Sequence, residues 1–124
     1  MKRKIIVAGS RTFIDYEILK QKLDELAVNT DNAEIVCGEA RGADTLGKKY
    51  AIENGLEVKS FPAKWSIYGR KAGMIRNKQM AEYANEVVVF WDGESKGTKN
   101  MIELANNYNL ILTIVDINSP EQTK

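Results

Sequence analysis

The sequence predicts an α/β protein: a Rossmann-like three-layer sandwich with a five-stranded, mainly parallel sheet. Two observations support this prediction. Short apolar runs rich in β-branched residues alternate along the chain with longer segments of helical periodicity, a pattern typical of parallel sheets covered on both faces. Three of the apolar runs are followed directly by loops rich in glycine and charged residues, within IIVAGSRTF, EIVCGEARGAD and VVVFWDGESKGT. In such sheets, ligands bind beyond the carboxyl ends of the strands.

Each element expected in the first half of the chain has a local signal. Residues 4–8 are apolar and suit a buried strand. Asp15 can cap a helix that continues to about Ala27, because apolar residues recur on one helical face. A second strand is expected at residues 34–37. A second helix is expected at residues 43–53, where the following Asn54 and Gly55 form a common helix-ending signal.

The second half continues the alternation. We expect a third strand at residues 56–61, a loop at 63–68, a helix at about 70–83 and a strand at 86–91, followed by a helix at 97–107 and a strand at 110–116. Right-handed crossovers would place strands 4–8 and 86–91 centrally, with a ligand crevice between their carboxyl ends. We expect one domain over residues 1–117 and a flexible polar tail at 118–124.

Composition restricts the possible functions. The chain of 124 residues has 18 basic and 17 acidic residues, no histidine and one cysteine. The absence of histidine excludes Ser-His-Asp and Cys-His catalysis, and we expect no metal and no cofactor. The net charge of +1 argues against an anionic membrane or nucleic acid as partner. No apolar run approaches the roughly 20 residues of a membrane span, so a cytoplasmic protein is expected.

The first two glycine-containing loops are candidate anion sites. In the first loop, Gly9 permits a tight turn, while Ser10 and Arg11 offer donors to a phosphate; a plain turn with a solvated arginine is the alternative. The second loop supplies the candidates Gly38, Arg41, Gly42 and Asp44. Asp44 either holds a ribose hydroxyl or merely stabilises the first turn of the following helix.

The remaining candidates follow the third and fourth strands. Trp65 is placed to stack on a base beside Lys64, or to fold back over the edge of the core. Arg76 and Asn77 lie in a helix that begins near the expected crevice. The last loop opens a helix and has no GxGxxG or Walker pattern, yet it can bind phosphate through helix N–H groups. Its candidate ligand-binding residues are Asp92, Gly93, Ser95, Gly97 and Thr98.

The segments GSRTF, GEARGAD, FPAKW, GMIRNKQM and FWDGESKGTKNMI, in this order and spacing, resemble the SLOG superfamily of Rossmann-like proteins, and most closely its YspA-like branch, found in bacteria and phages. The resemblance covers residues 4–115. The superfamily includes LOG phosphoribohydrolases, which release a base from nucleoside monophosphates. It also includes the DNA-processing protein A group, which binds single-stranded DNA, and proposed sensors of nucleotide-derived signals.

The resemblance carries over to individual residues. The hydrolases have a PGGxGTxxE loop that binds phosphate, and aligning its Gly-Thr pair with Gly97 and Thr98 places Met101 at the glutamate. Arg76 matches the catalytic arginine. The resemblance therefore implies phosphate binding without the usual catalytic carboxylate. It also implies a homodimer or higher oligomer, for which Met74, Met80, Tyr68 and Tyr83 are interface candidates, with the core as the alternative.

Three functions follow as hypotheses. The first is a module that binds a nucleotide-like small molecule, as a sensor or a sequestering protein. The second is an N-glycosidic hydrolase in which Arg76 anchors phosphate and a carboxylate such as Asp92, Glu94 or Asp44 assists departure of the base. The third is single-stranded DNA binding, against which the near-neutral charge argues.

Overall fold

The computed structural model describes residues 2–30 and 32–118. Five parallel strands form one sheet in the order β3-β2-β1-β4-β5. The strands are β1 (Arg3–Gly9), β2 (Ala33–Cys37), β3 (Glu57–Ser60), β4 (Glu86–Trp91) and β5 (Ile111–Asp116). This arrangement confirms the predicted fold class, including the position of β1 beside β4 near the centre of the sheet.

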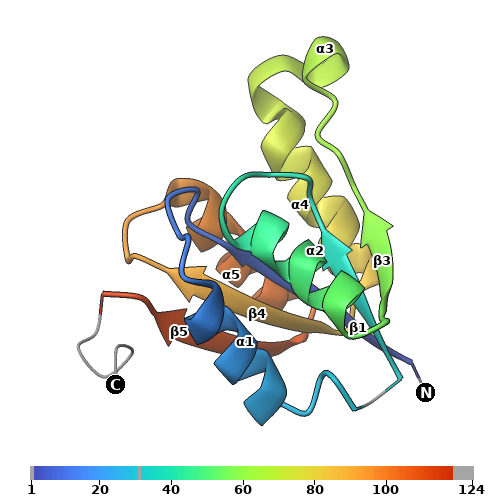
Figure 1. Ribbon diagram of the computed structural model, residues 1–124. Coiled ribbons are helices and arrows are strands. Elements are labelled where there is room, and N and C mark those ends of the chain that lie inside the picture. The colour runs from blue at the N-terminus through green and yellow to red at the C-terminus, as the bar shows by residue number, and fades with distance from the viewer. Residues whose placement is uncertain (1, 31, 119–124) are drawn as a thin grey trace.

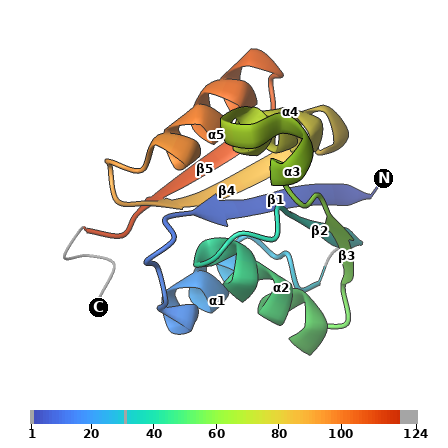
Figure 2. The same ribbon diagram turned by 90° about the horizontal axis from the view of Figure 1, so that it is seen from above.

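Helices cover both faces of the sheet (Figures 1 and 2). Helices α1 (Tyr16–Glu25) and α2 (Ala43–Glu53) lie on one face, and α4 (Ala72–Tyr83) and α5 (Lys96–Asn107) lie on the other. Asp15 caps α1 as expected, because its carboxylate accepts a hydrogen bond from the Ile18 amide. The predicted bounds of α2 and β4 match the structure, and most other bounds differ by one or two residues.

The expected loop at residues 63–68 is wrong in part. A short helix, α3 (Trp65–Tyr68), and a 3-10 helix, η1 (Gly69–Lys71), precede α4, which therefore begins at Ala72 rather than near residue 70. A Cβ added to Gly73 would lie 3.5 Å from the Trp65 ring, so this ring rests beside the start of α4. That contact comes from tertiary structure, and local periodicity carries no sign of it.

Two apolar clusters form the core, one on each face of the sheet. Tyr50 and the stacked rings of Phe13 and Phe90 belong to the cluster under α1 and α2. Met80 and Met101 belong to the cluster under α4 and α5. Met80 is thus a core residue, whereas Met74 is exposed. Cys37 is buried, as expected of a small apolar side chain.

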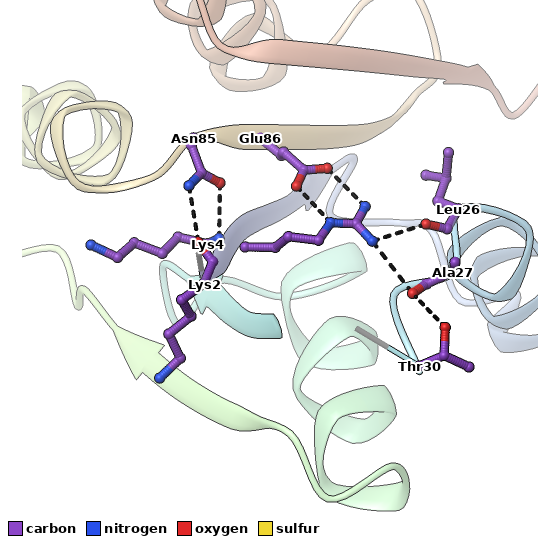
Figure 3. Close-up of polar contacts among 8 residues, drawn as sticks. Lys2, Lys4, Leu26, Ala27, Thr30, Asn85 and Glu86 are labelled. Carbon is purple, nitrogen blue, oxygen red and sulfur yellow. Dashed lines mark hydrogen bonds and ion pairs between the residues drawn. The ribbon is translucent and has the colours of Figure 1, made fainter. Parts of the chain in front are cut away.

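The amino ends of β1 and β4 are joined by polar contacts (Figure 3). The Arg3 guanidinium donates to both carboxylate oxygens of Glu86, at 2.7 and 2.9 Å, and also to the carbonyl oxygen of Leu26. The Asn85 side chain accepts from the Lys4 amide and donates to the Lys2 carbonyl. These contacts fix the two strands at the end of the sheet away from the glycine-containing loops.

Only the first residue of the expected flexible tail lies within the described part of the chain. Asn118 donates from its side chain to the Asp92 carbonyl at 2.7 Å and from its backbone to Asp116. Residues 119–124 lie outside the described residues.

Candidate functional site

A cavity of about 370 Å³ opens at the carboxyl ends of β1 and β4, between the starts of α2 and α5 and one side of α4. Its position is where a parallel sheet with this strand order places ligands. The lining contains three basic side chains, two acidic ones and an apolar floor. The residues are Ala8, Gly9, Arg11, Thr12, Ala40, Asp44, Arg76, Asn77, Met80, Asp92, Ser95, Lys96, Gly97, Thr98 and Met101.

Asp92 organises the loop that opens α5. Its Oδ1 accepts hydrogen bonds from the amides of Glu94 and Ser95, both at 2.8 Å, and its Oδ2 accepts from the Ser95 hydroxyl at 3.0 Å. These donors, the Glu94 amide first, lower the pKa of Asp92 to about 2. Ser10 connects this loop to β1, because its Oγ accepts from the Asp92 amide at 3.3 Å. Asp92 therefore holds the loop in shape rather than presenting a free carboxylate.

Arg76 is held against the loop after β2. Its Nη1 donates to the Gly38 carbonyl, and its Nε donates to the Asn77 side-chain oxygen at 2.9 Å. Burial lowers the pKa of the guanidinium, while the nearby Asp44 carboxylate opposes that shift. Asn77 in turn donates to Asn100 Oδ1 at 3.0 Å and to the Gly97 carbonyl, which connects α4 to the start of α5. Arg76 is thus positioned with one edge of its guanidinium fixed.

Asp44 is a buried carboxylate in the cavity wall. Its side chain is only 6% exposed, and its Oδ2 accepts from the amides of Gly38 at 3.0 Å and Ala40 at 3.2 Å. Burial raises the pKa of Asp44 to about 6, although both amides and Arg76 favour the charged form. Both hydrogen bonds formed within the described chain fall on Oδ2, which leaves Oδ1 for a donor in the cavity.

The glycines of the first two loops are explained by protein contacts. A Cβ on Gly9 would lie 2.4 Å from the Phe90 carbonyl oxygen, and one on Gly38 would lie 2.5 Å from Arg76 Nη1. Gly42 has a φ of +77°, and its Cβ would lie 2.2 Å from the Ser10 carbonyl oxygen. These residues let the loops pack against one another, and Gly9 also lines the cavity. Gly93 and Gly97 have open space around them.

The structure brings together most of the residues proposed from the sequence. Those that line the cavity are Gly9, Arg11, Asp44, Arg76, Asn77, Asp92, Ser95, Gly97 and Thr98. Those outside its lining are Ser10, Gly38, Arg41, Gly42, Lys64, Trp65, Gly93 and Glu94. Ser10, Gly38 and Gly42 still support the site through the contacts above, whereas Arg41 and Glu94 are exposed.

Sequence reasoning did not select two polar lining residues, Thr12 and Lys96. Both lie inside loops that were already singled out, so extending each candidate set to the whole loop would have found them. Met101 lies in the lining and is buried, which puts a thioether at the position that the resemblance assigns to a carboxylate.

Comparison with known proteins identifies the family. The sequence profile described as the YspA, cpYpsA-related SLOG family matches residues 3–68. The chain belongs to this family. One relative, the Gene 61 protein of Mycobacterium phage D29, is 32% identical over 110 residues, covering 83% of this chain and 88% of the phage protein.

Two solved structures share the SLOG chain's fold. DNA processing protein A from Streptococcus pneumoniae superposes with a TM-score of 0.73 at 16% identity, over 92% of this chain and 50% of its own. DNA processing protein A from Helicobacter pylori, whose structure describes a single-stranded DNA binding mode, superposes with a TM-score of 0.65 at 20% identity, over 90% of this chain and 64% of its own. The chain therefore spans half to just under two thirds of these proteins.

Within residues 2–30 and 32–118, no helix is both long and apolar enough to cross a lipid bilayer.

Proposed function

We propose that the cavity binds a small nucleotide-like ligand that carries ribose and phosphate. One observation supports this most directly: a buried carboxylate with an unused oxygen, Asp44, shares a cavity with the cations Arg11, Arg76 and Lys96. A ligand with both hydroxyl donors and a phosphate complements such a set, because carboxylates accept from hydroxyls and guanidinium groups pair with phosphate. Family membership supports a nucleotide-related or DNA-binding role at the coarser level.

The two ends of the ligand have separate counterparts. The phosphate is assigned to the start of α5, where the exposed Lys96 and Gly97 and the buried Thr98 begin a helix of 12 residues. Amides at a helix N-terminus attract anions, and the neighbouring lysine adds a full charge. The ribose is assigned to Asp44, across the cavity.

The first test is native mass spectrometry after incubation with pooled nucleoside monophosphates, NAD and cyclic nucleotides. An intact adduct that survives dilution is the expected result, and its mass identifies the ligand. The complete absence of an adduct at millimolar ligand would contradict the proposal. The assembly mass read in the same spectrum tests the homodimer expected from the resemblance.

Arg76 provides a site-specific prediction. R76Q removes the positive charge and the paired N–H donors of the guanidinium group. We expect binding of the identified ligand to weaken by about 10- to 100-fold, because this is the effect of removing one charge-assisted hydrogen bond. K78Q is the matched control, because Lys78 lies two residues along α4, is exposed and is outside the cavity lining. Isothermal titration of both variants checks this, and equal losses of affinity in the two would contradict the assignment.

A hydrolase is the second candidate, and it would use Asp44. Asp44 keeps one oxygen without a hydrogen bond from a described residue, whereas both oxygens of Asp92 accept hydrogen bonds within its loop. Glu94 is exposed and lies outside the lining. A pKa of about 6 at Asp44 suits proton donation to a departing base. Release of free base and a retained ribose phosphate in the same spectra would favour this candidate, whereas an intact ligand favours the binding module.

A further inference from the structure

The basic residues of the chain are unevenly distributed. Residues 58–81 contain six basic residues and no acidic one. The rest of the chain holds 12 basic and 17 acidic residues, a net charge of −5. The net charge of +1 is therefore the sum of a strongly basic segment and an acidic remainder. For this reason the total charge is a weak argument against a nucleic-acid partner. Local charge, rather than the total, determines which partners a surface attracts.

Part of this segment projects from the molecule. Residues 64–74, here called the basic arm, comprise Lys64, α3, η1 and the first residues of α4. Figure 1 shows α3 standing clear of the sheet at the outer end of α4. Neither α3 nor η1 has a buried residue. The arm therefore adds little to the core, although it is an ordered helical element.

The arm presents aromatic rings beside cations. Trp65 is 53% exposed and Tyr68 is 44% exposed, while the Trp65 ring lies beside Gly73. Exposed aromatic rings beside cations are a platform on which bases can stack. Ile67 and Met74 add further exposed apolar surface.

The described residues provide no acidic partner for the cations of the arm. Lys64, Arg70 and Lys71 are exposed and form no ion pair with any described residue. Some lysines elsewhere are paired: Lys20, Lys22 and Lys48 each lie within 4 Å of a carboxylate, at 2.9, 3.2 and 3.5 Å. Others, such as Lys49 and Lys99, also form no ion pair with a described residue, so the arm differs in grouping its unpaired cations beside exposed rings. Three neighbouring unpaired cations repel one another, and an anionic partner would relieve that repulsion.

Helix α4 leads from the arm to the cavity. Arg70 and Lys71 stand just before its start, and Arg76, one to two turns further on, is in the cavity wall with Arg11 and Lys96. The cations of the arm thus lie within about two helical turns, along the chain, of a residue in the cavity wall.

We propose that the basic arm is a binding surface for single-stranded nucleic acid, with Trp65 and Tyr68 stacking on bases while Lys64, Arg70 and Lys71 pair with phosphates. Unpaired bases expose the faces that stacking requires, which favours a single strand over a duplex. This inference goes beyond the proposed small-molecule function and does not depend on it, because the three cations of the arm lie outside the cavity lining.

The test is fluorescence anisotropy of a labelled single-stranded oligonucleotide of about 20 nucleotides, titrated over a range of salt. For the triple variant K64Q/R70Q/K71Q, we expect affinity at ~0.1 M salt to fall about 100-fold. The slope of log affinity against log salt should decrease in magnitude by about 2, or ~0.7 for each phosphate that is no longer neutralised. W65A should weaken binding by at least about fivefold without changing that slope, because stacking releases no counterions.

The matched control is K22Q/K49Q/K99Q, which removes the same total charge from α1, α2 and α5. Its reduction of affinity should be about tenfold smaller than that of the arm variant. Equal reductions of affinity in both triple variants would overturn the inference, as would absence of binding by the unmodified protein. Binding of anionic lipid vesicles but not of the oligonucleotide would also overturn it. Retention of the cavity ligand by the arm variant separates this result from the proposed function.

Discussion

Replacement of Gly42 by alanine is expected to destabilise the protein by at least ~3 kcal/mol. Gly42 precedes α2 with a φ of +77° and a ψ of −127°, outside the left-handed helical region, a conformation that costs alanine about 1–3 kcal/mol. In addition, the new Cβ would lie 2.2 Å from the Ser10 carbonyl oxygen, so the loop after β1 must move. Urea-induced unfolding of both proteins at one temperature measures the difference in the free energy of unfolding.

Gly55 provides the matched control for this experiment. It also has a positive φ, +67°, but a Cβ there meets no atom within 4 Å. G55A should therefore lower the free energy of unfolding only by the conformational strain, about 1–2 kcal/mol. The difference between the two variants measures the steric contact between the loops after β1 and β2 together with the stricter backbone requirement at Gly42. Equal destabilisation of G42A and G55A would show that this contact does not matter.

Replacement of Asp44 by asparagine is expected to stabilise the protein at pH 8 by ~3 kcal/mol. The folded-state pKa of about 6 lies above the ordinary 3.8, so the folded protein binds this proton more tightly than the unfolded chain does. Above pH 6, the charged form of Asp44 consequently lowers the free energy of unfolding. Asparagine has an oxygen that can accept from the Gly38 and Ala40 amides, and it removes the charge.

The sign of the pH dependence is the decisive observation. As the pH falls through about 6 toward 3.8, Asp44 takes up its proton in the folded protein, and the advantage of D44N should disappear by about pH 4. Urea unfolding at several pH values checks this, and a pH-independent difference would contradict it. D92N is the control of opposite sign. The pKa of Asp92 is lowered to about 2, so D92N should be the less stable protein above pH 4.

The sheet was predictable because its signals are local. Runs such as residues 86–91 are continuous in β-branched and aromatic side chains, and their alternation with helical periodicity identifies a parallel sheet. The positions of the glycine-containing loops at one end of that sheet followed from the same reasoning. For this reason Arg11, Arg76 and Thr98, which are distant in sequence, could be assigned to one site.

The parts that could not be predicted depend on tertiary contacts. The helix α3 carries no amphipathic period, and the contact between Trp65 and Gly73 is formed only in the fold. The structural role of Gly42 could not be predicted either, because its sequence context does not reveal that the Ser10 carbonyl packs against it. Likewise, burial and hydrogen bonding separate Asp44 from Asp92, two carboxylates that look equivalent in the sequence.

The strand order has a consequence for synthesis of the protein. β1 can pair with β2 as soon as residue 37 has emerged, but its other neighbour, β4, begins at residue 86, where Glu86 pairs with Ile5. Until then, the apolar edge at residues 5–8 has no partner strand on that side. A chain interrupted before residue 86 therefore exposes a buried strand, the kind of edge on which nascent chains aggregate. During synthesis, the pairing of β1 with β4 is a long-range contact that can form only after β4 has emerged, and the contact between Ser10 and Asp92 has to wait with it.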